Sequence, residues 1–337
     1  MRSKISEVDI DTLIYPLFVK RGSSIKEPIP SMPGVYRFSP DMVLAEVERA
    51  RGSGIKKILL FGLPKDKDEY ATAAYRDGNI VSKTVALIKE HIPDIQIMTD
   101  VCLCAYTTHG HCGILKSQQS GVRSPEKKHA GSGPRTPDSG LIDQETTLNL
   151  LAKTAVSHAA AGADYVAPSA MQRGQVGAIR SALDKNGYRD TKIMGYSAKF
   201  ASQFYGPFRD VADSSPKFGD RMGYQLDYND RESAFERIEK DIKEGADIVM
   251  IKPALAYLDI IREAKVFFRH PMAVYNVSGE YAMVKAGAKS GYWDEKKMVL
   301  EIIAGMRRAG ADLIITYHAY DIARWSEKKK VLECSKA

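Results

Sequence analysis

The chain repeats one pattern eight times: a short run of apolar and β-branched residues, usually preceded by a segment with helical spacing. Three of these runs begin with the identical Gly-Ala-Asp, at Gly162, Gly245 and Gly310. A glycine at such a position ends a helix in a left-handed cap, and a short turn then leads into a buried strand. The expected strands lie at 14–19, 53–62, 95–101, 162–169, 192–199, 245–253, 272–278 and 310–317.

Eight strands that alternate with helices predict an α/β fold, the closed (β/α)8 TIM barrel. A doubly wound sheet is the alternative, but no Gly-x-Gly-x-x-Gly fingerprint follows any of the strands. We expect residues 13–325 to form one catalytic domain, between a short N-terminal arm at 1–12 and a polar C-terminal tail at 326–337. Residues 115–140 are rich in Ser, Gly, Pro and basic side chains, which predicts a long lid loop.

Composition argues against several classes of protein. A hydrophobic content of 44% and a charged content of 27% are typical of soluble globular chains, and no apolar run reaches the roughly 18 residues that span a bilayer. The first residues carry acids and no apolar stretch, which argues against a secretory signal and predicts a cytoplasmic location. The net charge of +7 is spread along the chain without a nucleic-acid-binding signature, so an anionic small molecule explains it equally well.

Polar, reactive side chains stand at the closing ends of the expected strands, which is where TIM barrels carry their active sites. Lys252 is the most informative, because it ends the buried run Ile-Val-Met-Ile-Lys. Desolvation favours a neutral amine, and a neutral amine attacks carbonyl groups. The alternative is a lysine that reaches the rim or pairs with an acid. The full set at these ends is Asp100, Ser169, Lys199, Lys252, Ser278 and Tyr317.

Three cysteines crowd into the loop that follows the third strand: Cys102, Cys104 and Cys112. Three thiolates can occupy three corners of a tetrahedron around Zn²⁺ and leave the fourth position open, as catalytic zinc sites do. A closed structural site would instead recruit His109 or His111, and buried cysteines without any metal are a third reading.

Several motifs add a specific resemblance. Besides the cysteine loop and the two lysines, the chain carries four short motifs in the order in which a known family has them. They are FYGPFR at 204–209, GDR at 219–221, MIKP at 250–253 and VSGEY at 277–281. The chain from about Leu13 to Arg324 resembles the porphobilinogen synthase (5-aminolaevulinate dehydratase) family, in its three-cysteine zinc type. The resemblance implies condensation of two 5-aminolaevulinate molecules to porphobilinogen with loss of two waters, an early step of tetrapyrrole (haem) biosynthesis.

The resemblance also implies roles for individual residues. Lys252 is expected to form a Schiff base with the first, P-site substrate, Lys199 to act as its partner at the A site, and Asp100 to transfer protons near the zinc. Read without the family, each arginine of the expected substrate site is a surface charge, each aromatic a core residue and Ser169 a helix cap. The substrate-binding residues implied are Arg209, Arg221, Gln225, Ser278, Tyr317, Ser169, Tyr205 and Phe208.

Assembly is a further expectation. Only about a dozen residues precede Leu13, whereas family members commonly carry a longer arm that builds an octamer, so we expect a smaller homo-oligomer, a dimer or hexamer. Glu232 corresponds to a position where some members bind an allosteric Mg²⁺, although a surface glutamate is the simpler reading.

Two other functions compete with this one. A class I aldolase-type Schiff-base lyase needs one lysine but neither the second lysine nor the cysteines. A noncatalytic zinc-bound barrel scaffold needs no reactive lysine at all. Zinc content distinguishes the first rival, and borohydride trapping of an imine distinguishes the second.

Overall fold

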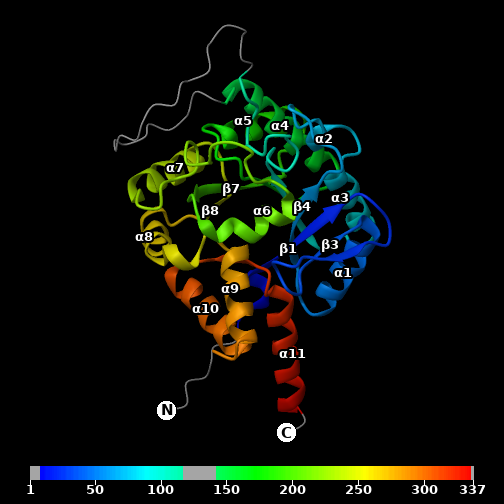
Figure 1. Cartoon of the computed structure of the whole chain (residues 1–337), viewed down its shortest axis with the longest axis vertical. Coiled ribbons are helices and arrows are strands. Elements are labelled where there is room, and N and C mark those ends of the chain that lie inside the picture. The colour runs from blue at the N-terminus through cyan, green and yellow to red at the C-terminus, as the bar shows by residue number, and fades with distance from the viewer. Residues whose placement is uncertain (1–7, 117–141, 335–337) are drawn as a thin grey trace.

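A closed barrel of eight parallel strands, surrounded by helices, forms the centre of the computed structural model, which describes residues 8–116 and 142–334 (Figure 1). The strands follow one another around the barrel in chain order, and β10 pairs with β1 to close it. The predicted (β/α)8 barrel is therefore confirmed. The barrel strands are β1 (Leu13–Lys20), β4 (Lys57–Leu63), β5 (Gln96–Val101), β6 (Tyr165–Pro168), β7 (Lys192–Lys199), β8 (Ile248–Lys252), β9 (Met272–Asn276) and β10 (Leu313–Thr316).

Most helices connect consecutive strands and pack on the outside of the barrel. The helices are α1 (Pro40–Gly52), α2 (Thr72–Tyr75), α3 (Ile80–His91), α4 (Gln144–Ala160), α5 (Gln175–Lys185), α6 (Gly206–Ala212), α7 (Arg231–Lys243), α8 (Leu258–Phe268), α9 (Ser278–Lys289), α10 (Glu295–Ala309) and α11 (Ala319–Cys334). Helix α11 continues into the segment that we expected as a polar tail. Within the described ranges, no helix combines the length and the apolar character that a membrane crossing requires.

Side chains alternate along each strand between the barrel interior and the helical layer, as the two-residue period of a strand requires. On β1, Ile14 and Phe18 pack inside the barrel, whereas Leu13 and Leu17 pack against helices. Both faces are therefore buried, which explains why the strands read as continuous apolar runs.

The three Gly-Ala-Asp segments share one local structure. Gly162, Gly245 and Gly310 have φ of 98°, 99° and 122°, a region that favours glycine. The aspartate two residues later accepts a hydrogen bond from the first residues of the preceding barrel strand, which ties each helix end to the sheet. These bonds run from the backbone N–H of Ile97 to Asp164 (2.7 Å), of Ile193 to Asp247 (2.8 Å) and of Met272 to Asp312 (2.8 Å).

A small hairpin, absent from our expectations, extends the sheet beside β1. Its strands β2 (Lys26–Pro28) and β3 (Tyr36–Phe38) pair antiparallel, and β3 continues the sheet from the closing end of β1. Residues 117–141, which include most of the expected lid loop, and residues 1–7 of the expected arm lie outside the described residues. The ends of the lid segment meet, since Leu115 pairs with Ile142.

Candidate active site

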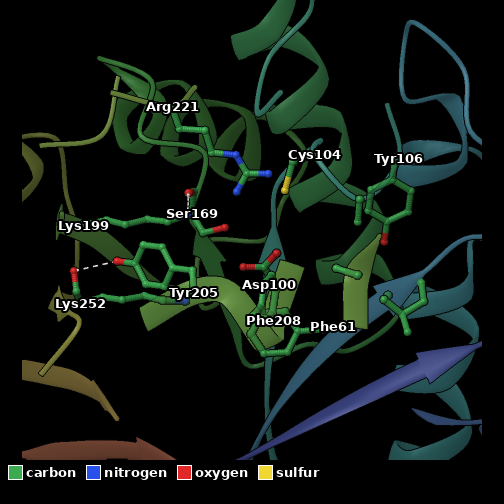
Figure 2. Close-up of a pocket in the computed structure, with 14 residues that line it drawn as sticks. Phe61, Asp100, Cys104, Tyr106, Ser169, Lys199, Tyr205, Phe208, Arg221 and Lys252 are labelled. Carbon is green, nitrogen blue, oxygen red and sulfur yellow. Dashed lines mark hydrogen bonds between the residues drawn. The ribbon is translucent and has the colours of Figure 1, made fainter. Parts of the chain in front are cut away.

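Two lysines stand next to each other at the closing ends of β7 and β8. Lys199 and Lys252 are register partners in the sheet, and both are buried. Figure 2 shows their side chains extending side by side into one pocket, with Asp100 and Arg221 also facing that pocket. The space in this pocket that the centre of a water molecule can reach is about 30 Å³.

Lys252 lies among aromatic rings. Its Nζ is 4.2 Å from the ring centre of Tyr275 and 5.2 to 5.3 Å from those of Tyr196, Tyr205 and Phe208. Ring faces at this distance favour an ammonium. Burial works in the opposite direction, and together with the positive charge of Lys199 it lowers the pKa of Lys252 to about 7. A substantial fraction of Lys252 is therefore a neutral amine near neutral pH.

Asp100 completes the polar part of this pocket. Burial raises the pKa of its carboxyl to about 6, against the opposing effects of a hydrogen bond from Ser169 and the positive charges of the two lysines. The Nζ of Lys199 donates to the backbone carbonyl of Ser169 at 2.8 Å. Ser169 thus connects a lysine on β7 with a carboxyl on β5. An acid with a pKa of about 6 next to a neutral amine can both give and take protons near pH 7.

The three cysteines come together as the sequence predicts. The sulfur atoms of Cys102, Cys104 and Cys112 lie within 4.8 Å of one another, all three side chains are buried, and the Sγ atoms of Cys102 and Cys104 are 3.4 Å apart. Hydrogen bonds from the other two thiols hold the pKa of Cys112 well below its usual value. A compact set of three sulfurs with one thiolate already favoured suits Zn²⁺.

Neither neighbouring histidine joins the cysteine cluster. His109 Nδ1 accepts a hydrogen bond from the backbone N–H of His111 at 3.1 Å, and the ring of His111 lies against Tyr224 Oη and the carbonyl of Phe218. Among the described residues, the side chains at this place that could together bind a metal ion are the three cysteines alone. The three cysteines could therefore hold a metal ion without a histidine ligand.

Several polar side chains on the segment between β7 and β8 have buried atoms without a hydrogen-bond partner. Arg221 donates to the carbonyls of Gly110 and Ser214, yet its Nε has no partner among the described residues. The same is true of Arg209 Nε and of both amide atoms of Gln225. Burial and the charge of Arg221 lower the pKa of Arg209. Buried polar atoms without partners cost roughly 1–3 kcal/mol each, and a bound carboxylate would accept hydrogen bonds from the two Nε atoms and from Gln225 Nε2.

The remaining predicted substrate-binding residues surround the end of β9. Ser278 Oγ accepts from the backbone N–H of Phe208 at 3.1 Å and donates to the carbonyl of Phe204 at 3.2 Å. Tyr275 Oη donates to Tyr317 Oη at 2.9 Å, and Tyr205 Oη donates to the Lys252 carbonyl at 3.1 Å. Tyr205 and Phe208 line the pocket, whereas Ser278, Tyr317, Arg209 and Gln225 lie outside its lining.

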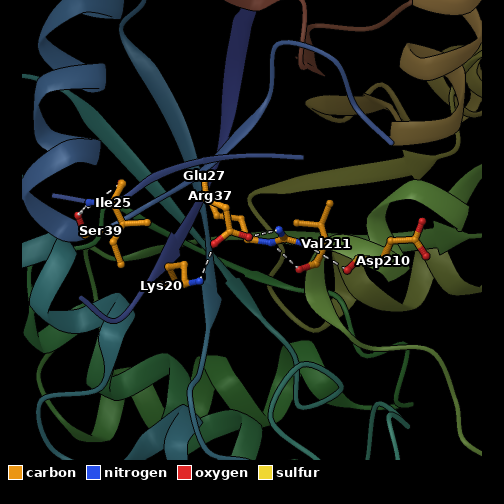
Figure 3. Close-up of polar contacts among 7 residues, drawn as sticks. All are labelled: Lys20, Ile25, Glu27, Arg37, Ser39, Asp210 and Val211. Carbon is orange, nitrogen blue, oxygen red and sulfur yellow. Dashed lines mark hydrogen bonds and ion pairs between the residues drawn. The ribbon is translucent and has the colours of Figure 1, made fainter. Parts of the chain in front are cut away.

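Helix α6 contributes Phe208 and Ala212 to the pocket lining, and its last turn contacts the hairpin of β2 and β3. Arg37 on β3 donates to the carbonyls of Val211 (3.2 Å) and Asp210 (3.4 Å) in the last turn of α6, and its Nη1 pairs with Glu27 at 2.6 Å (Figure 3). A cation suits the carbonyl end of a helix. The unpredicted hairpin therefore helps to place Phe208, which α6 carries, over Lys252.

Two other places with candidate metal ligands differ from the cysteine cluster. Glu232 lies exposed in the first turn of α7. Glu295, His318 and Asp321 also lie close together, but Lys285 Nζ is 2.5 Å from Glu295 and 3.5 Å from Asp321. One ammonium therefore pairs with both carboxylates of this group and offsets part of their negative charge.

Sequence reasoning missed the rings of Tyr196 and Tyr275 beside Lys252, and Phe61 and Tyr106 in the pocket wall. Tyr196 and Tyr275 lie on barrel strands that end at the pocket. An inward position at alternate residues of such strands is the only signal that could have identified them.

Comparison with known proteins agrees with this geometry. The family model of delta-aminolevulinic acid dehydratase, the enzyme also called porphobilinogen synthase, matches residues 1–325. The dehydratase of Synechocystis sp. is 49% identical over 316 residues (94% of this chain and 91% of the relative), and that of Bacillus subtilis is 46% identical over 327 residues (96% and 94%). A crystal structure of the Toxoplasma gondii enzyme in complex with the reaction product porphobilinogen superimposes with a TM-score of 0.86 at 42% identity, covering 94% of this chain and 85% of that one. The chain belongs to the delta-aminolevulinic acid dehydratase family.

Proposed function

We propose that this chain makes porphobilinogen with the residues around Lys252 and Lys199. The activity is that of its family: two 5-aminolaevulinate molecules condense asymmetrically to porphobilinogen with loss of two waters, and the chain is thus a lyase of tetrapyrrole biosynthesis. The observation that supports these roles is the pair of lysines at adjacent strand ends, one of them with a pKa of about 7.

Lys252 would act first. Its neutral amine attacks the keto carbon of the P-site substrate, and an imine forms as water leaves. The aromatic rings around Lys252 exclude bulk water and so disfavour hydrolysis of that imine. Ser278 and Tyr317, which follow the ends of β9 and β10, would bind the carboxylate of this first substrate.

The second substrate would bind between Lys199 and the arginines. The unpaired Nε atoms of Arg209 and Arg221, with the unpaired amide of Gln225, offer donors to its carboxylate. Lys199 can form the second imine, and Asp100, whose carboxyl faces the same pocket, would carry the protons that pyrrole formation releases. Ser169, Tyr205 and Phe208 shape the pocket.

Zinc is the metal that we propose for the cysteine cluster. Cys102, Cys104 and Cys112 would hold it, and Cys104 lines the same pocket as the two lysines. Bound there, Zn²⁺ would polarise the carbonyl of the second substrate or organise its amino group. Glu232 would mediate a response to Mg²⁺, and Mg²⁺ titration of a Glu232→Gln variant tests this role.

The proposed function predicts two linked results with the wild-type chain. Incubation with 5-aminolaevulinate should yield porphobilinogen, detected by its pyrrole chromophore. Borohydride added during turnover should leave a covalent adduct that peptide mapping places on Lys252. Product without an adduct on Lys252 would contradict the role of this lysine. An adduct without product would instead favour an aldolase-type lyase, and the absence of both would favour a zinc-bound scaffold.

We also propose a homo-oligomer smaller than an octamer, a dimer or hexamer, located in the cytoplasm. Val266 and Phe267 on α8 are 56% and 72% exposed, and such apolar area favours a subunit contact. Light scattering of the purified chain measures the mass directly. A mass of eight subunits would rule out the smaller assembly.

A further inference from the structure

Glu280 is a buried carboxylate that the reaction scheme above does not use. It lies in the first turn of α9 and is 0% exposed. One of its oxygens accepts a hydrogen bond from the backbone N–H of Leu255 at 2.6 Å, and the other accepts from the backbone N–H of Val277 at 2.6 Å and from the Asn276 amide at 3.2 Å. Among the described residues, every group within hydrogen-bond distance of this carboxylate is a donor.

These partners belong to two catalytic strand ends. Leu255 lies three residues after Lys252, and Val277 directly precedes Ser278. One side chain therefore connects the chain leaving β8, which carries the imine-forming lysine, with the chain leaving β9, which carries a proposed ligand of the first substrate's carboxylate.

The same network reaches a third strand. Asn276 accepts a hydrogen bond from the hydroxyl of Thr316 at 2.9 Å, and Thr316 directly precedes Tyr317. Asn276 and Thr316 are also register partners in the sheet. Glu280, Asn276 and Thr316 thus form one buried hydrogen-bonded chain across the ends of β8, β9 and β10.

The hydrogen-bond donors around Glu280 favour its anion, and burial opposes it. Burial raises the pKa of its carboxyl to about 7, while the backbone and Asn276 N–H donors counteract that rise by favouring the anion. A carboxylic acid would direct its proton at an N–H group, and a glutamine would direct its NH2 group at one. The site therefore accepts a carboxylate better than its isosteric amide, because one of the two short bonds is lost in the amide.

We propose that Glu280 is a positioning residue for porphobilinogen synthesis: through Leu255, Val277 and Asn276 it fixes the relative positions of Lys252, Ser278 and Tyr317, the three residues of the first substrate's site. This inference rests on the proposed function, since it assumes that Lys252 forms the imine. Small displacements matter here, because misplacing a reacting group by about 1 Å can lower a rate on the order of 100-fold.

The test compares two carboxylate-to-amide variants. Glu280→Gln should lower kcat and the rate of borohydride-trappable imine formation on Lys252 at saturating 5-aminolaevulinate by about 10- to 100-fold. Glu46→Gln is the matched control: Glu46 is also buried, but it binds Tyr15 on β1 and Arg49 on α1, away from the closing strand ends. Its kcat and trapping rate per folded chain should equal those of the wild type.

A second variant keeps the inference testable if Glu280→Gln folds poorly. Thr316→Val removes the hydroxyl that donates to Asn276 and that accepts from the backbone N–H of His318, and it should lower the trapping rate in the same direction by a smaller factor. Wild-type trapping rates in folded Glu280→Gln or in Thr316→Val, with only the melting temperature changed, would overturn the inference. Wild-type chain that shows no adduct on Lys252 would overturn the proposed function instead.

Discussion

The Lys252→Met variant is expected to form porphobilinogen roughly 10⁴- to 10⁶-fold more slowly than the wild type, the scale of loss when a covalent nucleophile is removed. Methionine preserves the length and the apolar stem of lysine but has no nitrogen to form an imine. The adduct on Lys252 should also disappear from borohydride-treated protein. Porphobilinogen assays and peptide mapping measure both losses.

Two other lysines make this prediction specific. Lys192→Met changes an exposed lysine at the opposite end of β7 and should leave activity intact. Lys199→Met should lose product formation but keep the adduct on Lys252, because the first imine does not require the second lysine. An active Lys252→Met variant would remove Lys252 from the mechanism.

Stability separates this chemical loss from misfolding. The pKa of Lys252 is about 7 in the folded chain, against 10.5 for an ordinary lysine. Between these two values the unfolded chain binds a proton that the folded chain does not, so the stability of the wild type rises with pH across that window. Lys252→Met has no amine at this position and therefore lacks this pH-dependent loss of stability. It should therefore melt at or above the wild-type temperature at pH 7, with an advantage that shrinks as the pH approaches 10.

The same pKa predicts the pH dependence of imine trapping. The trapping rate should rise with pH up to about 7 and then level off, whereas an exposed lysine would continue to gain reactivity toward pH 10. In Lys199→Met the midpoint should move to higher pH, because the neighbouring positive charge is removed. A midpoint unchanged by Lys199→Met would show that burial alone sets the pKa.

The barrel could be predicted because its signals are local and repeated. The Gly-Ala-Asp segments combine a left-handed glycine with an aspartate that binds the neighbouring strand, and continuous apolar runs follow from burial on both faces. The hairpin of β2 and β3 could not be predicted in the same way. Its strands have three residues each, too few to show a period.

The chemistry of the site was also readable, because it depends on residue types at strand ends. Lys199, Lys252 and the three cysteines converge because parallel strands in a barrel all end at one face. Their surroundings were not readable. In the sequence, Tyr196 and Tyr275 lie within apolar runs and resemble any aromatic residue of a protein core. Glu280 resembles an ordinary acidic residue in the first turn of a helix. Only the fold shows that the two tyrosine rings lie beside Lys252 and that Glu280 accepts hydrogen bonds from the backbone of Leu255 and Val277.

Metal removal is the second large effect that we expect. A chelator-treated chain should lose about one equivalent of Zn²⁺ and nearly all porphobilinogen formation, and added Zn²⁺ should restore both. The physical reason is the position of Cys104, which lines the pocket that holds the two lysines. The adduct on Lys252 should survive metal removal, because imine formation requires only the neutral amine. Activity that is indifferent to chelation would reduce the cysteines to a structural role.

Cysteine variants assign the metal to its ligands. Replacing Cys102, Cys104 and Cys112 together by serine should abolish Zn²⁺ binding, because a hydroxyl does not ionise to a ligand as a thiol does. Cys334→Ser, at the end of α11, is the control and should bind metal normally. Co²⁺ offers a readout independent of activity, since thiolate coordination gives an intense near-ultraviolet band that the control should show and the triple variant should lack. Full metal content in the triple variant would place the zinc elsewhere in the chain, and a bound metal without the thiolate band would mean that oxygen or nitrogen atoms hold it.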